Sequence, residues 1–169
     1  DHGLWIGHLA IYLDVTEQKR AYEALAARDR LLKKLSAHVP GGIFQFTLEP
    51  QDNWRFIYAS DGMRDIYEIE TGVLQQDANK VFERIHPDDL ERVRRSVRYS
   101  AEHLSPWREE YRVCLPRAGL RWVRGEATPE ELPGGGVLWH GYISDISDLK
   151  RVEEELRALS VTDSLTGIH

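Results

Sequence analysis

The chain has 169 residues, of which 41 % are hydrophobic and 30 % charged; this is enough apolar material for one core and argues against a disordered chain. Its formal net charge of −6 argues against nucleic-acid binding, because nucleic-acid modules usually carry a basic face. No apolar run approaches the roughly 20 residues needed to cross a bilayer, so we expect no membrane contact within this segment and a cytoplasmic location, with any anchor of the parent protein elsewhere.

A short sequence occurs twice in the chain. Residues 14–20 read DVTEQKR and residues 145–151 read DISDLKR. In each copy an apolar, β-favouring run stops at Asp14 or Asp145, and a charged helical pattern begins at Thr16 or Ser147. Both copies therefore predict a strand that passes directly into a helix. We expect the last strand of a preceding domain over 1–14, a linker helix over 15–36, a globular domain over 37–148 and a second helix over 149–162.

The linker helix is predicted because residues 16–36 contain no Gly or Pro and are rich in strong helix formers, with Thr16 as the N-cap. Its residues Gln18, Tyr22 and Leu25 begin a four-three alternation that is only partly apolar. Two interpretations stay open. The helix could pair with its copy in a second chain, or it could lie on its own domain.

The globular domain is predicted to contain five strands and several helices. Alternating apolar runs indicate strands near 43–48, 54–59, 107–115, 120–128 and 137–146. Short helices are expected between residues 61 and 85, and a longer one begins at Pro87, with Leu90, Val93, Val97 and Leu104 as its apolar stripe. The fold class is α+β: successive hairpins give a five-stranded antiparallel sheet, and the helices cover one face of it, leaving a cup between them.

These elements carry motifs that resemble those of the PAS family of sensory domains. The sequence IHPDD at residues 85–89 precedes the long helix, and RWV at residues 121–123 lies in a later strand. The resemblance covers about residues 36–148. DVT at 14–16 and DIS at 145–147 are similar to the family's junction motif, at which the last strand releases the chain into a signalling helix. The resemblance implies a PAS fold and, for residues 1–14, the end of a preceding PAS domain.

A second resemblance lies near the C-terminus. Residues 159–168, LSVTDSLTGI, are similar to the opening of a GGDEF domain, the catalytic unit of diguanylate cyclases, so that residues 163–169 would begin such a domain. The family's catalytic loop has no counterpart here, and we expect no catalytic residue in this segment. The implied function is a sensory domain that regulates cyclic di-GMP synthesis. The alternatives are a ligand-free dimerisation spacer and the sensor of a histidine kinase.

The cup could hold a small apolar or aromatic ligand, and its walls would come from strand and helix residues without fixed charges. The candidates are Phe46, Tyr58, Met63, Ile66, Val97, Tyr111, Val113 and Trp122. No known cofactor is indicated. Covalent flavin chemistry in this family needs a Cys near the start of the long helix, whereas Cys114 lies in a late strand and is expected to pack in the core. His86 and His103 are better explained as helix-end residues than as haem ligands, and no metal site is expected.

Signal transmission is assigned to the two junctions and to the second helix. Leu149, Val152, Leu156 and Leu159 have the three-four-three spacing of a parallel two-helix seam, which predicts a homodimer through the linker helices. The alternative is that this stripe packs on the sheet of its own chain. Asp145 is expected to anchor the hinge by holding local backbone N–H groups and a nearby cation. The transmitting residues are therefore Asp14, Thr16, Asp145, Ser147, Leu149, Val152, Leu156 and Leu159.

Overall fold

The computed structural model describes residues 17–28, 30, 40–50 and 52–166. The chain divides into two compact units, residues 1–38 and residues 39–169. In the first unit, residues 17–28 form a helix on which Tyr22 and Leu25 are exposed. The strand expected over residues 1–14, together with Asp14 and Thr16, lies outside the described residues, as do residues 29 and 31–36 of the expected linker helix.

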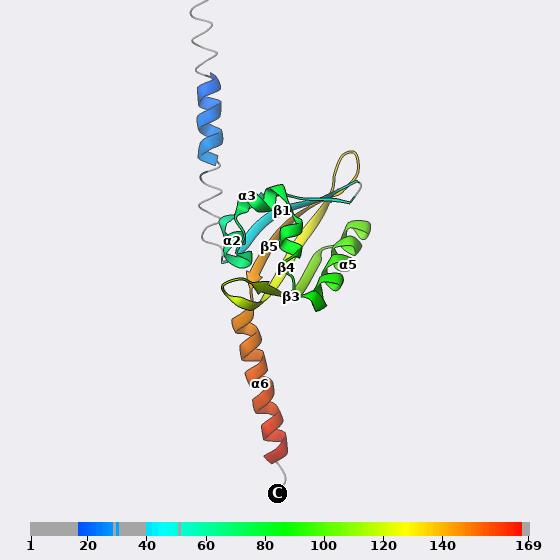
Figure 1. Ribbon diagram of the computed structural model, residues 1–169. Coiled ribbons are helices and arrows are strands. Elements are labelled where there is room, and N and C mark those ends of the chain that lie inside the picture. The colour runs from blue at the N-terminus through cyan, green and yellow to red at the C-terminus, as the bar shows by residue number, and fades with distance from the viewer. Residues whose placement is uncertain (1–16, 29, 31–39, 51, 167–169) are drawn as a thin grey trace, which may run out of the picture. The chain divides into compact units, whose positions relative to one another are not determined.

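The second unit contains a five-stranded sheet in which every neighbouring pair is antiparallel (Figure 1). The strands are β1 (Gly42–Glu49), β2 (Asn53–Ala59), β3 (Trp107–Leu115), β4 (Gly119–Glu131) and β5 (Val137–Asp145). Their order in the sheet is β2-β1-β5-β4-β3, so the last strand of the chain lies in the centre and β3 forms an edge. The predicted α+β class and the five-stranded antiparallel sheet are confirmed.

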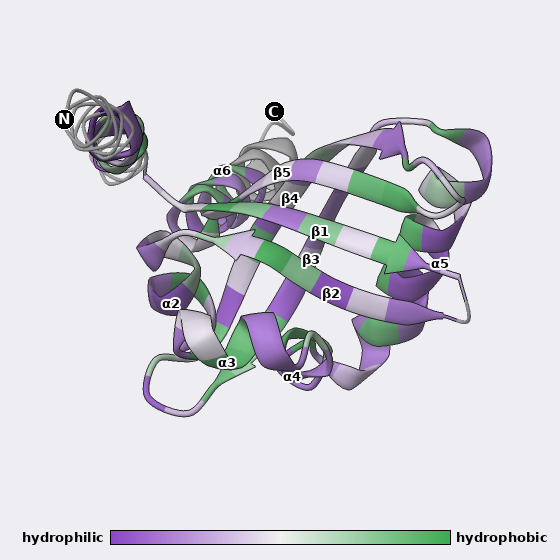
Figure 2. Ribbon diagram, turned by 90° about the horizontal axis from the view of Figure 1, so that it is seen from above, coloured by the Kyte–Doolittle hydropathy of each residue, from purple (hydrophilic) through white to green (hydrophobic). Residues whose placement is uncertain are grey.

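Four helices between β2 and β3 cover one face of the sheet, as seen from above in Figure 2. They are α2 (Asp61–Tyr67), α3 (Thr71–Gln76), α4 (Asn79–Phe82) and α5 (Pro87–His103). A fifth helix, α6 (Ser147–Thr166), follows β5 after one residue and begins against β4. It is longer at both ends than the expected 149–162.

The long helix α5 begins where the sequence predicts. Pro87 occupies the first turn, and the His86 ring accepts a hydrogen bond from the backbone N–H of Asp88 at 3.3 Å. The helix ends at Leu104, which adopts a left-handed conformation with φ 48°. Leu104 was expected in the apolar stripe, but as the C-cap it turns away from the core and is exposed.

The core fills the space between the sheet and helices α2 to α5. Alternate strand residues point toward the helices and form the sheet side of the core. Two strand glycines leave room for large aromatic rings to lie over the sheet. A Cβ at Gly141 would lie 2.1 Å from the Phe44 ring, and one at Gly125 would lie 2.4 Å from the Trp107 ring. Glycine at these two strand positions is therefore a packing requirement.

One expectation about the core is wrong. Cys114 was expected to pack in the interior of its strand, but it is exposed. Its neighbours Val113 and Leu115 occupy the buried face of β3, so the alternation of a strand directs Cys114 to the other face.

Candidate functional site

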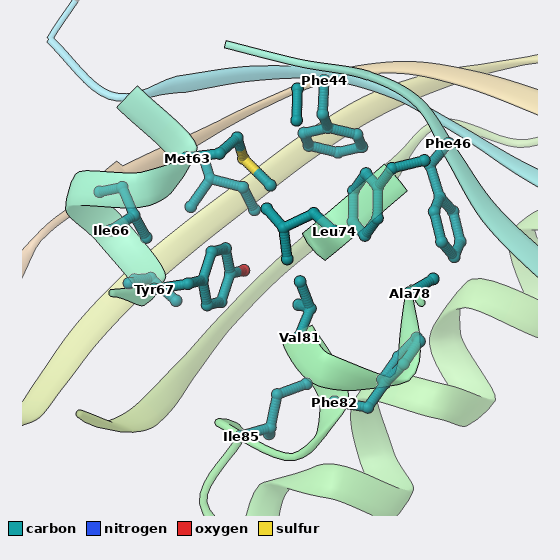
Figure 3. Packing of buried hydrophobic residues seen from close by; sticks show 14 of the residues in the cluster. Phe44, Phe46, Met63, Ile66, Tyr67, Leu74, Ala78, Val81, Phe82 and Ile85 are labelled. Atoms are coloured by element: carbon teal, nitrogen blue, oxygen red, sulfur yellow. The ribbon is translucent and has the colours of Figure 1, made fainter. Parts of the chain in front are cut away.

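A small cavity lies inside the cup, between the sheet and the helices. It measures about 50 Å³, and its walls are aromatic and aliphatic side chains of β1, β2, β3, β5, α2, α4 and α5. Figure 3 shows Phe44 and Phe46 from the sheet facing Met63 and Tyr67 of α2 across this interior. Ligand pockets usually measure roughly 300–1,000 Å³, so the space is far smaller than a flavin or haem would require unless the walls moved.

Four of the eight candidate pocket residues line this cavity: Phe46, Met63, Val97 and Tyr111. Ile66 and Val113 are buried in the same core, with 8 % and 0 % of their surface exposed, but they do not form the cavity wall. The four lining residues come from β1, α2, α5 and β3, so the fold brings together side chains that are far apart in sequence.

The other two candidates lie on the opposite face of the sheet, and for them the expected facing is corrected. A register shift beside Phe46 pairs it with Phe56 and pairs Gln45 with Tyr58, so the bulge at residue 57 turns Tyr58 outward. Trp122 precedes Val123, which is 1 % exposed and occupies the inner face. Simple alternation then places Trp122 on the outer face.

Two buried hydroxyl groups form the polar feature of the cavity. The hydroxyl oxygens of Tyr67 and Tyr111 lie 2.6 Å apart, and the two residues are 1 % and 2 % exposed. Burial raises the pKa of Tyr67 well above its ordinary value and raises the pKa of Tyr111 to about 12, so both are neutral near pH 7. Their mutual hydrogen bond uses one of two hydroxyl protons; the second can serve an acceptor inside the cavity.

The three histidines in the described part of the chain, His86, His103 and His140, lie outside the walls of this cavity. His103 stacks on Tyr99 with ring centroids 4.0 Å apart at the exposed end of α5. His140 is on the outer face of β5, where it contacts Gln45 at 3.2 Å. His86 caps α5 as described above. Among the described residues no group of three or more His, Cys, Asp or Glu side chains could hold a metal ion.

A second functional region is the junction between β5 and α6. The Asp145 carboxylate accepts a hydrogen bond from the backbone N–H of Ser147 at 2.8 Å, which closes the turn at the start of the helix. The Ser147 hydroxyl in turn accepts one from the backbone N–H of Trp122 at 3.0 Å, and Ile146 donates its backbone N–H to the Trp122 carbonyl at 2.8 Å. Asp145 thus holds a local backbone N–H group as expected, and Ser147 connects the start of α6 to β4.

The cation expected near Asp145 is instead held by another carboxylate. Lys150, in the first turn of α6, places its Nζ 2.6 Å from Glu110 of β3, and Arg124 of β4 binds the same carboxylate at 2.6 Å. Hydrogen bonds from Lys150 and Arg124 lower the pKa of Glu110, and the bond to Glu110 raises the pKa of Lys150. The first turn of α6 is therefore bound to β3 by a charge-assisted bond, and the same carboxylate is bound to β4 through Arg124.

Trp122 connects this junction to the long helix α5. Its ring lies under both the Lys150 ammonium, at 5.2 Å, and the Arg112 guanidinium, at 5.8 Å. Arg112 binds Asp89 of α5 through Nε and Nη2, each at 2.9 Å, and Asp89 also accepts the backbone N–H of Arg112 at the outer edge of β3. A continuous set of contacts therefore runs from the IHPDD segment to α6.

Sequence reasoning missed four members of this set: Glu110, Arg112, Arg124 and Lys150. Their signal was present but weak, because charged residues at alternate positions of two adjacent strands are usually a solvated face. The repeated Lys in DVTEQKR and DISDLKR was a better clue, since its position after the junction occurs in both copies. Their meeting depends on strand register, which pairs Arg112 with Trp122 and Glu110 with Arg124.

The apolar stripe of α6 is exposed. Leu149, Val152, Leu156 and Leu159 retain 43 %, 46 %, 62 % and 67 % of their surface. They are therefore largely uncovered by the described part of their own chain. No helix among the described residues has the length and apolar character needed to span a membrane.

Comparison with known proteins adds three findings. A family model described as the PAS fold matches residues 56–143. A curated relative, the uncharacterized protein y4lL of Sinorhizobium fredii, is 29 % identical over 157 residues, which is 88 % of this chain. The chain spans only 17 % of that relative's length.

Solved structures of similar fold come from signalling proteins. A sensory box histidine kinase/response regulator from Burkholderia thailandensis is 24 % identical, with a TM-score of 0.56 over 83 % of this chain and 99 % of that chain. The N-terminal domain of a diguanylate cyclase with PAS/PAC sensor from Marinobacter aquaeolei is 22 % identical, with a TM-score of 0.51 over 62 % and 95 %. At these identities the likeness concerns the fold.

Proposed function

Because this chain belongs to the PAS family, we propose that it is a sensory domain that passes a change in its core to a C-terminal output unit through α6. The observation that carries the proposal is the ion pair between Lys150 and Glu110, which joins the first turn of the helix to the sheet. A helix attached at this point must move when β3 and β4 move. In this proposal the cup receives the signal, and the signal leaves the domain where α6 begins at Ser147, which is hydrogen-bonded to β4.

The path between them has two ends. At one end, α5 supplies both cavity-lining Val97 and Asp89, so a shift of α5 caused by an occupant of the cup would also displace Asp89. At the other end, Arg112 and Lys150 contact the same Trp122 ring. A signal would shift the equilibrium between two positions of α6 relative to the sheet, as in other two-state elements.

We propose a homodimer in which the α6 stripe forms a parallel two-helix seam. Its three-four-three spacing suits such a seam, and the exposure of its four residues favours this reading over packing on the sheet of the same chain. A rotation of α6 would then change how two output units face each other. In the spacer alternative the same seam forms, but an occupant of the cup has no effect on output.

For the output we favour a diguanylate cyclase. The support is the similarity of residues 159–168 to the opening of a GGDEF domain, together with a solved relative of the same fold from a diguanylate cyclase. Cyclases of this type join two GTP molecules across a pair of catalytic units, which gives a dimeric helix a mechanical role. A histidine kinase remains the second candidate, because another relative of the same fold is a histidine kinase.

The test removes the cation at the first turn of α6. In the full-length protein, Lys150→Met should change the rate of cyclic di-GMP formation severalfold, while the free energy of unfolding changes by less than about 1 kcal/mol, because the pair is partly exposed. The matched control is Arg151→Met. Arg151 is the next cation on the same helix, is mostly exposed and pairs only locally with Asp148.

The outcomes separate the alternatives. A change in cyclase rate in Lys150→Met but not in Arg151→Met supports transmission through the Glu110 contact. Equal rates in both variants and the parent would contradict it and favour the spacer. Autophosphorylation in place of cyclic di-GMP formation would identify a kinase output while leaving the Lys150 comparison valid for that activity.

We also propose that Asp145→Ala alters output more than it alters ligand binding.

A further inference from the structure

A second cavity lies on the outside of the core. It measures about 340 Å³ and opens where the start of β2, the α3–α4 segment and α5 meet. Its walls include Trp54, Asn79, Phe82, Arg94 and Arg98. Phe82 also borders the cup, so its ring is a partition between the two spaces. In contrast to the apolar cup, this cavity is lined mainly by charged and amide side chains.

Arg94 is the unusual member of this wall. Its guanidinium stacks over the Phe82 ring at 5.1 Å, which holds it in place. Its Nε is buried yet has no hydrogen-bond partner, and none of the carboxylates in the described part of the chain lies within ion-pair distance of it. The buried Nε is itself closed to solvent, but the guanidinium to which it belongs lines the cavity without a carboxylate partner. An anion in the cavity could therefore form charge-assisted hydrogen bonds with the terminal nitrogens of Arg94 and would be bound favourably.

Arg98 shows what such an acceptor looks like. It lies one turn further along α5 and stacks over the Trp54 ring at 5.5 Å. Its Nη2 binds the Asp52 carboxylate at 2.8 Å, and the Trp54 indole N–H donates to the same carboxylate at 3.0 Å. One oxyanion is therefore already recognised at the rim of this cavity by an aromatic-stacked arginine. Arg94 is the equivalent arginine without its anion.

The charges of the walls favour an anionic occupant. Arg98 pairs with Asp52 and Arg55 pairs with Glu49, whereas Arg94 has no carboxylate partner among the described residues. The amide side chains of Gln76 and Asn79 can orient oxygen atoms of a ligand. The volume is within the range of small-molecule sites. We propose that this cavity binds a small oxyanionic molecule, a carboxylate or a phosphate, with Arg94 as its main anchor and Arg98 as a second one for which Asp52 competes.

The experiment titrates the whole chain with two probes, malate and inorganic phosphate, at constant ionic strength set with chloride. Amide and arginine Nε–H signals are followed by ¹H–¹⁵N NMR. We expect saturable shifts at Asn53, Asn79 and the Arg94 Nε–H, with a dissociation constant on the order of millimolar for such small probes. Tighter binding of malate or of phosphate identifies the chemical class of the natural ligand.

Three variants test the assignment. Arg94→Gln should weaken binding at least about tenfold, because a charge-assisted pair is lost. Arg95→Gln is the matched control, since this neighbouring arginine is exposed and outside the cavity wall, and it should change affinity less than about twofold. Asp52→Asn should tighten binding severalfold because it releases Arg98, and asparagine keeps an oxygen for the Trp54 N–H and tolerates the positive φ of 64° at this position.

Several results would overturn the proposal. These are the absence of a saturable shift with either probe, equal weakening in Arg94→Gln and Arg95→Gln, or weaker binding in Asp52→Asn. If Arg94→Gln does not fold, Arg94→Lys keeps the charge and removes the planar fork, and it should still weaken binding. Wild-type affinity in that variant would refute the anchoring role of Arg94. The test reads binding alone and does not depend on the output proposed above.

Discussion

The contact between Asp89 and Arg112 allows a quantitative prediction for Asp89→Asn. Three hydrogen bonds from Arg112 reach the carboxylate, each at 2.9 Å. The side-chain hydrogen bonds from Arg112 lower the pKa of Asp89 from the ordinary 3.8 to about 2. Such a shift corresponds to about 2 kcal/mol of folding free energy at pH 7. This is an upper figure, since the Arg112 side chain is 27 % exposed and solvent screens the pair.

The pH dependence gives the prediction its sign. The pKa of Asp89 is lower in the folded than in the unfolded chain, so its stabilisation is fully present above the ordinary carboxyl pKa. It is lost as the pH falls through the folded-state value. Asp89→Asn should therefore lower the free energy of unfolding by up to about 2 kcal/mol at pH 7. At pH 3 the difference from the parent should be about half as large.

Urea unfolding followed by circular dichroism, at pH 7 and pH 3, measures both differences. The control is Asp88→Asn. The Asp88 carboxylate is mostly exposed and only 3.7 Å from Arg112, so the loss should stay below about 1 kcal/mol. A destabilisation by Asp89→Asn that is equal at the two pH values would refute the electrostatic reasoning. It would indicate that packing of the side chain, rather than its charge, stabilises the fold.

Two further predictions concern the core and the helix. Tyr67→Phe and Tyr111→Phe each leave a buried hydroxyl without its partner and should each lower the free energy of unfolding by about 1–2 kcal/mol. In urea unfolding the double variant should lose less than the sum of the two single losses, and additive losses would contradict the pairing. Leu156→Glu should convert the dimer to a monomer, because it places a charge in the proposed seam, and light scattering measures the oligomeric state. Arg157→Glu, beside the stripe, should remain a dimer. A dimer in both variants would exclude the seam.

Local sequence patterns were sufficient for the architecture. The limits of α5 follow from His86 and Pro87 at one end, and alternating apolar residues identify every strand of the sheet within a few positions. The strand-to-helix junction was visible because DISDLKR repeats an earlier segment, and the Asp145 carboxylate does accept a backbone N–H at the start of α6. Such features depend on neighbours along the chain, so the sequence by itself determines them.

The walls of the cup were only half predictable, for a reason that concerns strand register. Phe56 faces the core, so strict alternation would send Tyr58 inward as well, but the bulge between them reverses its direction. In β4 the sequence offers both Trp122 and Val123 as inward residues, and the prediction placed Trp122 in the wall. Only the assembled sheet shows that Val123 is covered and that Trp122 lies beneath two cations.

Contacts between distant segments were decided entirely by the tertiary structure. Lys150 meets Glu110 because β3, β4 and α6 converge at one place, and Arg94 faces an outer cavity because α5 passes the beginning of β2. No local pattern marks such pairs, since the chemistry of a charged side chain is the same whether or not a partner lies opposite. The sequence therefore determined the elements and their junction, while the packing of the sheet against α5 and α6 decided which charges meet and which remain open to a ligand.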